Sequence, residues 1–233
     1  MRSYDRAMPE ELNRVLTDHA ASLLLCSSPA AAQTLRDERV AGEVVEVGDV
    51  MVDVFALLAP RADGAALERL GVERGAYLLV TAHRAGNVDD PARLRALVTL
   101  LRELPGPVVL PLHPRTRARL EGERLLGELD GVVLAPPLGY LEFMALLLGA
   151  RRVLTDSGGV QKEAYLAGVP CVTLRATTEW RETVDAGWNV LVDLDAAAAR
   201  AALDREPPAE RPPLYGDGRA GERVVEALLR MVG

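Results

Sequence analysis

Three consecutive small residues, Ser157, Gly158 and Gly159, are the chemically most informative feature of the chain. Glycine has no Cβ, so the backbone N–H groups of such a turn can face an anion directly. A helix-like run follows at once, and the partial positive charge at a helix N-terminus favours a phosphate there. Glu163 lies one turn into that run, where its carboxylate could accept two ribose hydroxyls. The segment predicts a nucleotide site, although an ordinary strand-to-helix turn packed with small residues explains the glycine pair equally well.

The residues on either side place this turn in a parallel α/β unit. An apolar stretch from Arg152 to Thr155 ends at Asp156, immediately before the turn. Gly168-Val169-Pro170 closes the helix-like run, and a second apolar stretch extends from Cys171 to Leu174. The order strand, turn, helix, strand is typical of a parallel sheet with a crossover helix.

Polar residues also follow other predicted strands, at the sheet edge where parallel α/β proteins bind ligands. His83 and Arg84 follow the strand predicted at 77–81, and His113 follows the strand predicted at 108–112. A lone histidine at a strand end is usually structural, but two of the chain's three histidines lie at this edge, which favours function. Arginines that could contact a diphosphate are Arg84, Arg115, Arg175 and Arg181, with a solvated surface role favoured for Arg115 and Arg181.

The rest of the chain alternates apolar strands with helical spacings. We predict strands at 23–26, 44–47, 77–81, 108–112, 132–134, 152–155, 171–174 and 190–191. We predict helices at 9–19, 29–36, 50–58, 91–104, 115–126, 140–148, 195–203 and 219–231, besides the run after Gly159. Near-continuous apolar strands separated by helices predict a parallel sheet covered on both faces. The looser segment 59–75, with Pro60, Gly64 and Gly71, predicts a boundary between two units.

Composition limits the classes of function. The 233 residues are 49% hydrophobic, enough for a sizeable core, and carry a net charge of −7. No basic block stands out, which argues against a nucleic acid or an anionic membrane surface as partner. Cys26 and Cys171 lie far apart in apolar contexts and are expected to be buried thiols; no Cys/His cluster suggests a metal. No apolar run has transmembrane length and the N-terminus lacks a signal-peptide core, so we expect a cytoplasmic protein.

Beyond these patterns, several motifs carry a family resemblance. They are RSYDRAMPEELNRVLTDH, VGDVMVD, TAHRAGNVDD, LPLHPRT, PPLGYLEF, TDSGGVQKEAYLAGVPCVTLRATTEWRETVDAGWNVLV and YGDG, running in family order from Arg2 to about Gly218. With them the chain resembles the non-hydrolysing UDP-N-acetylglucosamine 2-epimerases. The resemblance implies an α/β fold of the GT-B type, with two Rossmann-like domains. It also implies interconversion of UDP-GlcNAc and UDP-ManNAc by elimination and re-addition of UDP, in the supply of sugars for cell-surface polysaccharides.

The resemblance assigns roles to individual residues. Glu10 matches an acid/base candidate of the family, and His83 matches its active-site histidine. The residues implied to bind UDP are Ser157, Gly158 and Gly159 at the diphosphate, Glu163 at the ribose, Phe143 and Leu138 at the uracil, and Arg175 and Glu179 in an Arg-x-x-Thr-Glu loop. No cofactor or metal is implied. The expected partners are UDP-GlcNAc and UDP, with a homodimer as the family's assembly.

Some positions depart from the family pattern. Gly86 replaces a common glutamate, Trp180 stands where some members carry a UDP-binding arginine, and Arg181 stands where many carry proline. The family's early Gly-Thr-Arg-Pro-Glu, Gly-Asp-Thr and Val-Glu-Ala-Gly segments have no counterpart here. We therefore expect residues 1–58 to be a remnant of the N-terminal Rossmann-like domain, 59–214 a complete UDP-binding domain, and 215–233 a helix packing back on the first.

Two other functions stay open at this point. The nucleotide-binding half is similar in GT-B glycosyltransferases and in hydrolysing epimerases, although the HPRT and TDSGGVQKEA segments favour the non-hydrolysing epimerase. Alternatively, the chain is a UDP-sugar-binding fragment or one subunit of a split enzyme, inactive alone and completed by a separate N-terminal half. Products formed from UDP-GlcNAc separate these possibilities.

Overall fold

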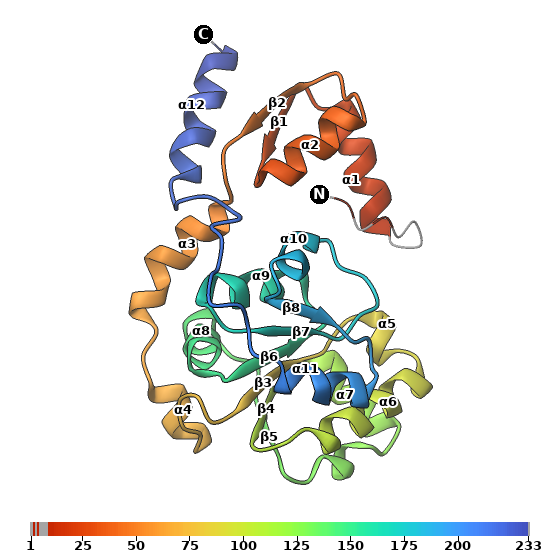
Figure 1. The fold of residues 1–233 in the computed structure, drawn as a ribbon. Helices are drawn as coiled ribbons and strands as arrows, with labels where there is room; N and C mark the ends of the chain where they lie inside the picture. Colours follow the sequence, from red (N-terminus) through yellow and green to blue (C-terminus); the bar gives the residue numbers. More distant parts are fainter. Residues whose placement is uncertain (1, 3, 5–8, 233) are drawn as a thin grey trace. The chain divides into compact units, whose positions relative to one another are not determined.

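The computed structural model describes residues 2, 4 and 9–232, which form two compact units (Figure 1). The first unit comprises Met1–Pro60, Glu179–Glu182 and Pro212–Gly233, and the second comprises Arg61–Thr178 and Thr183–Arg211. We describe each unit by itself.

The second unit is built on a parallel sheet whose strands lie in the order β5-β4-β3-β6-β7-β8. The strands are β3 Leu78–Thr81, β4 Val108–Pro111, β5 Val132–Ala135, β6 Arg152–Thr155, β7 Cys171–Thr173 and β8 Asn189–Leu191. The chain first winds outward from β3 to β5, then returns to the middle of the sheet and winds outward again from β6 to β8. Chain order therefore reverses between β3 and β6, and such a switch point is where doubly wound sheets bind ligands.

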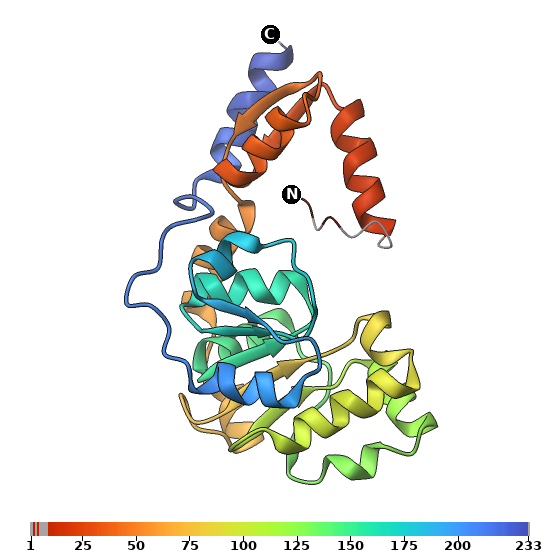
Figure 2. The same ribbon diagram turned by 45° about the vertical axis from the view of Figure 1, so that its right-hand side comes forward.

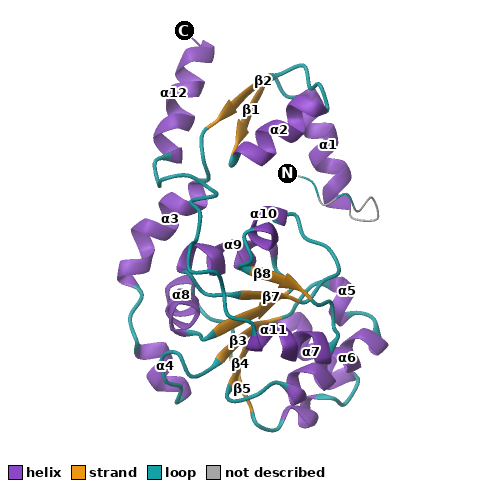
Figure 3. Cartoon of the chain, viewed as in Figure 1, coloured by secondary structure: helices purple, strands orange, loops and turns teal. Residues whose placement is uncertain are grey.

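Helices cover both faces of this sheet, as Figure 2 shows from a second direction. They are α4 Ala65–Leu70, α5 Ala85–Val88, α6 Pro91–Glu103, α7 Pro114–Gly122, α8 Tyr140–Gly149, α9 Gly158–Ala167 and α11 Ala196–Asp204, with a 3-10 turn at Leu126–Leu129. The short helix α10 Arg181–Asp185 begins in the first unit and ends in the second. Successive side chains of β3 point to opposite faces: Leu78 and Val80 pack with α6 and α11, whereas Leu79 packs with α4 and α8. Figure 3 shows the strands enclosed by helices in this way.

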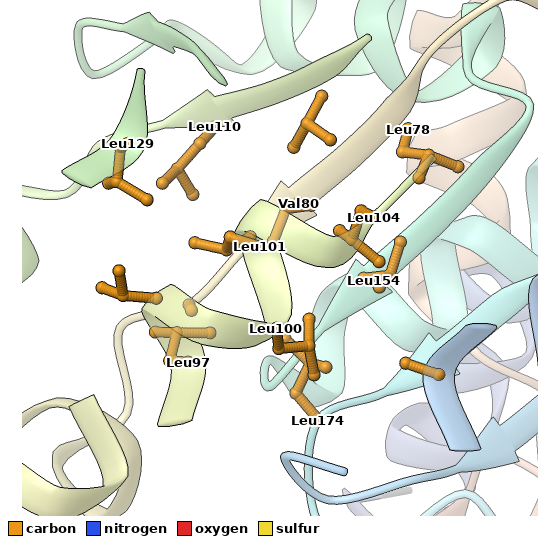
Figure 4. Close-up of a cluster of buried hydrophobic side chains, with 14 of the residues drawn as sticks. Leu78, Val80, Leu97, Leu100, Leu101, Leu104, Leu110, Leu129, Leu154 and Leu174 are labelled. Carbon is orange, nitrogen blue, oxygen red and sulfur yellow. The ribbon is translucent and has the colours of Figure 1, made fainter. Parts of the chain in front are cut away.

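The larger of the two cores lies on the α6 side and consists mainly of leucine and valine. Its leucines interdigitate between the sheet and α6 (Figure 4). Leu78, Leu100 and Leu154 are fully buried there. With aromatic residues at only 4% of the chain, aliphatic packing supplies the stability of this unit.

Most predicted elements are present, with differences at helix ends. The helix expected at 115–126 ends earlier, at Gly122, because Arg124 adopts a left-handed conformation with φ of 58°. The segment 59–75, expected to be loose, contains α4, which ends at the left-handed Gly71. The short helices α5 and α10 were not predicted, because four or five residues carry too little periodicity to recognise.

The first unit holds a two-stranded parallel sheet of β1 Leu23–Cys26 and β2 Glu43–Glu46. Its helices are α1 Pro9–Ala20, α2 Pro29–Asp37, α3 Val50–Leu58 and α12 Ala220–Val232, and a 3-10 turn at Ala59–Arg61 follows α3. Asp53 of α3 accepts hydrogen bonds from the backbone N–H groups of Ala220 and Gly221, at 3.0 and 2.7 Å, which joins α3 to the start of α12. None of the described helices is long and apolar enough to cross a membrane.

Candidate functional site

A pocket of about 470 Å³ opens in the second unit beside the carboxyl ends of β3 and β6, where the strand order reverses. Its lining residues come from the segments after β3, β4, β5 and β6: Thr81, Ala82, His83, Pro111, His113, Pro137, Leu138, Tyr140, Phe143, Ser157, Gly159, Val160 and Glu163. The pocket therefore joins six of the predicted site residues, namely His83, Leu138, Phe143, Ser157, Gly159 and Glu163.

Asp156, next to the pocket residue Ser157, connects the segments that follow β3 and β6. Its side chain is fully buried and accepts hydrogen bonds from the backbone N–H groups of His83 and Arg84, at 3.1 and 3.0 Å, and from the Asn87 amide at 3.1 Å. The Asn87 amide also donates to the carbonyl of Leu174, at the end of β7. One carboxylate thus fixes the loop after β3 against the loop after β6.

A hydroxyl pair joins the same two strands. The Oγ1 atoms of Thr81 and Thr155 lie 2.6 Å apart, and the Ser157 N–H donates to Thr155 Oγ1 at 2.9 Å. Ser157 is the N-cap of α9, yet its own hydroxyl makes no capping hydrogen bond. A Cβ built on Gly159 would meet only the Ser157 hydroxyl, at 3.9 Å, so the first turn of α9 is open to a ligand on this side.

Two stacked histidine rings also line the pocket. The rings of His83 and His113 stack with centroids 5.6 Å apart and an interplanar angle of 29°. His113 caps α7, since its Nδ1 accepts the Arg115 N–H at 3.2 Å, which leaves Nε2 as the protonated nitrogen of the neutral ring. The His83 Nδ1 lies 3.9 Å from an Asp156 carboxylate oxygen. Both rings can present N–H donors to an anion in the pocket.

Glu163 supplies the carboxylate of the pocket. Its Oε1 accepts a hydrogen bond from the Tyr140 hydroxyl at 2.9 Å. Burial raises the pKa of Glu163, and the Tyr140 hydrogen bond partly opposes this effect by stabilising the ionised form. Burial and the neighbouring Glu163 carboxylate raise the pKa of Tyr140, so its phenol stays protonated as a donor.

An apolar wall completes the pocket. Leu138 and Phe143 lie on the loop after β5 and on α8, and both pack partly buried against the smaller core of the unit. With Pro137 and Val160 they form a surface suited to a planar aromatic base. Nucleotide recognition needs hydrogen-bond donors for the diphosphate, an acceptor for the ribose hydroxyls and an apolar surface for the base. The pocket offers a group of each kind.

Other predicted site residues lie elsewhere. Gly158 begins α9 beside the pocket. Arg84 contributes its backbone N–H to Asp156, and Arg175 is 8% exposed at the end of β7. Glu179 belongs to the first unit, where it is buried and lies 3.6 Å from Arg14. Glu10 is exposed in the first turn of α1.

Sequence reasoning missed two members of the site. The role of Asp156 as an acceptor for three donors was not recognised, although its position directly before Ser157 was noted. Tyr140 ends the segment that follows the strand predicted at 132–134, at the edge expected to bind ligands, but the sequence gives it no individual role. Its spacing of three residues from Phe143 indicates that both side chains share a helix face.

We expect Asp156→Ala to lower the free energy of unfolding of the second unit by roughly 3 kcal/mol or more. The physical reason is that three donors would lose their fully buried acceptor. Denaturant unfolding followed by tryptophan fluorescence measures this loss, with the exposed Asp185→Ala as the control. Equal stability of the two variants would show that the Asp156 contacts contribute nothing net.

A model of the UDP-N-acetylglucosamine 2-epimerase family matches residues 1–229. The UDP-2,3-diacetamido-2,3-dideoxy-D-glucuronate 2-epimerase of Pseudomonas aeruginosa is 44% identical, over 99% of this chain and 66% of the relative. The UDP-N-acetylglucosamine 2-epimerase of Methanocaldococcus jannaschii is 37% identical, over 98% of this chain and 66% of the relative.

Solved structures agree with the sequence relatives. The M. jannaschii UDP-GlcNAc 2-epimerase, crystallised with UDP-GlcNAc and UDP, superposes with a TM-score of 0.87 at 36% identity, over 98% of this chain and 67% of that chain. The Neisseria meningitidis enzyme bound to UDP-GlcNAc gives a TM-score of 0.83 at 26% identity, over 98% and 67%. The predicted α/β fold of the GT-B type is therefore confirmed. The chain spans about two thirds of the length of the relatives it matches. It belongs to the UDP-N-acetylglucosamine 2-epimerase family.

Proposed function

We propose that the pocket binds the UDP part of a UDP-linked 2-acetamido sugar, and that the chain takes part in inverting carbon 2 of that sugar. The observation that carries this proposal is the convergence of the Ser157 turn, Glu163, the histidine pair and the apolar wall on one pocket. The M. jannaschii and N. meningitidis relatives, whose crystals contain UDP-GlcNAc, support it.

The proposed reaction follows the elimination route expected for the family. A base removes the proton at carbon 2, and the C1–O bond to UDP breaks with its electron pair leaving on the diphosphate. The resulting 2-acetamidoglucal is reprotonated at carbon 2 from the opposite face, and UDP adds back to carbon 1. In this scheme the N–H groups at the start of α9 and the His83 ring stabilise the charge that develops on the departing diphosphate. Glu10 is the proposed acid/base group.

Product analysis tests the function. The chain is incubated with UDP-GlcNAc, alone and joined to the third of the M. jannaschii enzyme that it does not cover. We expect UDP-ManNAc from the joined protein and little conversion by the chain alone, since catalytic groups that act as a unit fail together. Free ManNAc with UDP would indicate a hydrolysing epimerase, and a sugar transferred to an acceptor would indicate a glycosyltransferase.

A second substrate has support from the comparisons. The relative named for UDP-2,3-diacetamido-2,3-dideoxy-D-glucuronate is 44% identical to this chain, above the 37% of the M. jannaschii UDP-GlcNAc enzyme. The same elimination acts on carbon 2 of either sugar, so the pocket for UDP does not distinguish them. Competing the two UDP-sugars in one reaction and comparing their kcat/KM values decides between them.

We also propose that the protein works in the cytoplasm as a homodimer, the state expected from the family resemblance. Light scattering at micromolar concentration measures the mass in solution and distinguishes a dimer from a monomer.

We expect the affinity for UDP-GlcNAc to depend on pH through the protonation of the Glu163 carboxylate. Burial holds its pKa above the ordinary value, and the ionised form accepts ribose hydroxyls more strongly than the protonated form. The affinity advantage of the wild type over Glu163→Gln is therefore present above this pKa. As the pH falls, protonation of Glu163 should remove this affinity advantage. Because the pKa is raised, the loss should begin at a higher pH than it would for a glutamate with the ordinary pKa of 4.5. Calorimetric titration with UDP-GlcNAc at each pH measures the ratio of the two Kd values.

A further inference from the structure

Tyr140 and Glu163 form a pair that bridges two helices at the mouth of the nucleotide pocket. Tyr140 is the first residue of α8, and Glu163 lies in the second turn of α9. Both side chains line the pocket, and the Tyr140 hydroxyl donates to Glu163 Oε1 at 2.9 Å. In the described part of the chain, Tyr140 is the one hydrogen-bond partner recorded for the Glu163 side chain.

The start of α8 holds Tyr140 in place. The Glu142 side chain accepts the Gly139 N–H at 3.1 Å, which fixes the N-terminus of α8 on either side of Tyr140. Glu142 is itself bonded to Arg69 at 2.6 Å. Phe143, one turn further along α8, lies on the same face and packs against the smaller core. The Tyr140 ring thus projects from a fixed backbone toward Glu163.

This arrangement occupies one carboxylate oxygen and leaves the other to a ligand. A carboxylate has about four acceptor sites, so Glu163 keeps capacity for hydroxyls after it has accepted from Tyr140. The remaining acceptor sites of the carboxylate, held in a fixed orientation by Tyr140, suit a cis-diol, and the ribose of a nucleotide offers one.

We propose that Tyr140 is a positioning residue, which orients Glu163 toward the 2′- and 3′-hydroxyls and so makes the pocket selective for ribonucleotides. This inference rests on the proposed binding of UDP. The hydrogen bond also favours the ionised carboxylate against the opposing effect of burial, which keeps Glu163 a strong acceptor.

The test compares UDP with 2′,3′-dideoxy-UDP on the full chain by calorimetry. Tyr140→Phe removes only the hydroxyl, and we expect it to weaken UDP roughly tenfold, the effect of one lost hydrogen bond to a charged group. The same variant should change dideoxy-UDP affinity less than about twofold, because that ligand has no diol to recognise. Leu141→Ala, a neighbour on α8 outside the pocket lining, should leave both affinities unchanged.

A double-mutant cycle adds a second readout. In the Glu163→Ala background Tyr140→Phe should cause little further loss of UDP affinity, because the effect of Tyr140 passes through the carboxylate. The positioning role would be overturned if Tyr140→Phe weakened the binding of UDP and of dideoxy-UDP equally. It would also be overturned if the variant bound UDP as tightly as the wild type, or more tightly. If the wild-type chain binds no UDP at all, the proposed function itself fails, which is a distinguishable result.

Discussion

Glu163→Ala should weaken UDP binding to this chain by about 1–3 kcal/mol, because buried ribose hydroxyls would lose their acceptor. The carboxylate lies within the pocket at the switch point of the sheet and beside the open first turn of α9. Truncation to alanine also leaves the Tyr140 hydroxyl without its partner. Calorimetry with UDP measures the change directly.

A surface glutamate provides the control for this substitution. Glu121 lies on α7 in an exposed ion pair with Arg117 at 3.6 Å, so Glu121→Ala removes the same charge far from the pocket lining. Exposed pairs contribute little to stability, and we expect unchanged UDP affinity. If Glu163→Ala and Glu121→Ala bound UDP equally well, the assignment of the ribose site to Glu163 would be wrong.

The parallel fold of the second unit could be predicted because its strands are apolar almost throughout. Leu78, Leu79 and Val80 are all fully buried, as a strand covered on both faces requires. The strand at 152–155 was placed correctly for the same reason, since its burial is continuous. Helix ends were less predictable, because α7 is terminated by the backbone conformation of Arg124 rather than by a glycine or proline pattern.

The candidate site was only partly predictable, because its geometry depends on strand order. The sequence places His83 and Ser157 at the same edge of a sheet, but it does not say that β3 and β6 are neighbours. That adjacency brings Asp156 under the His83 and Arg84 amides, across more than seventy positions of chain. The Tyr140–Glu163 hydrogen bond likewise joins residues 23 positions apart on different helices. Local spacing contains no information about either contact.

Glu10 and Glu11 are neighbours in the first turn of α1, but their surroundings differ. This difference favours Glu10 over Glu11 as the proposed acid/base group. Glu10 is exposed in the first turn. Glu11 is 4% exposed, and it accepts the Tyr4 N–H at 3.1 Å and an Arg14 N–H at 2.9 Å. Glu11 therefore has a structural role in the first unit, whereas the Glu10 carboxylate is available for chemistry.

In the protein joined to the remaining third of a relative, Glu10→Gln should lower turnover of UDP-GlcNAc about a hundredfold or more. UDP affinity should change little, because the pocket residues proposed to bind UDP, such as His83, Ser157 and Glu163, lie in the other unit. The competing explanation is that Glu10 only stabilises the N-terminus of α1 through the helix dipole. That explanation predicts that Glu10→Gln has a slightly lower melting temperature and a normal rate.

Glu11→Gln is the matched control. We expect it to lower stability through the lost ion pair with Arg14, while most of the rate remains. A wild-type rate in Glu10→Gln would favour the helix-dipole explanation. A rate collapse in Glu11→Gln without loss of stability would instead move the acid/base role to the next residue along the helix.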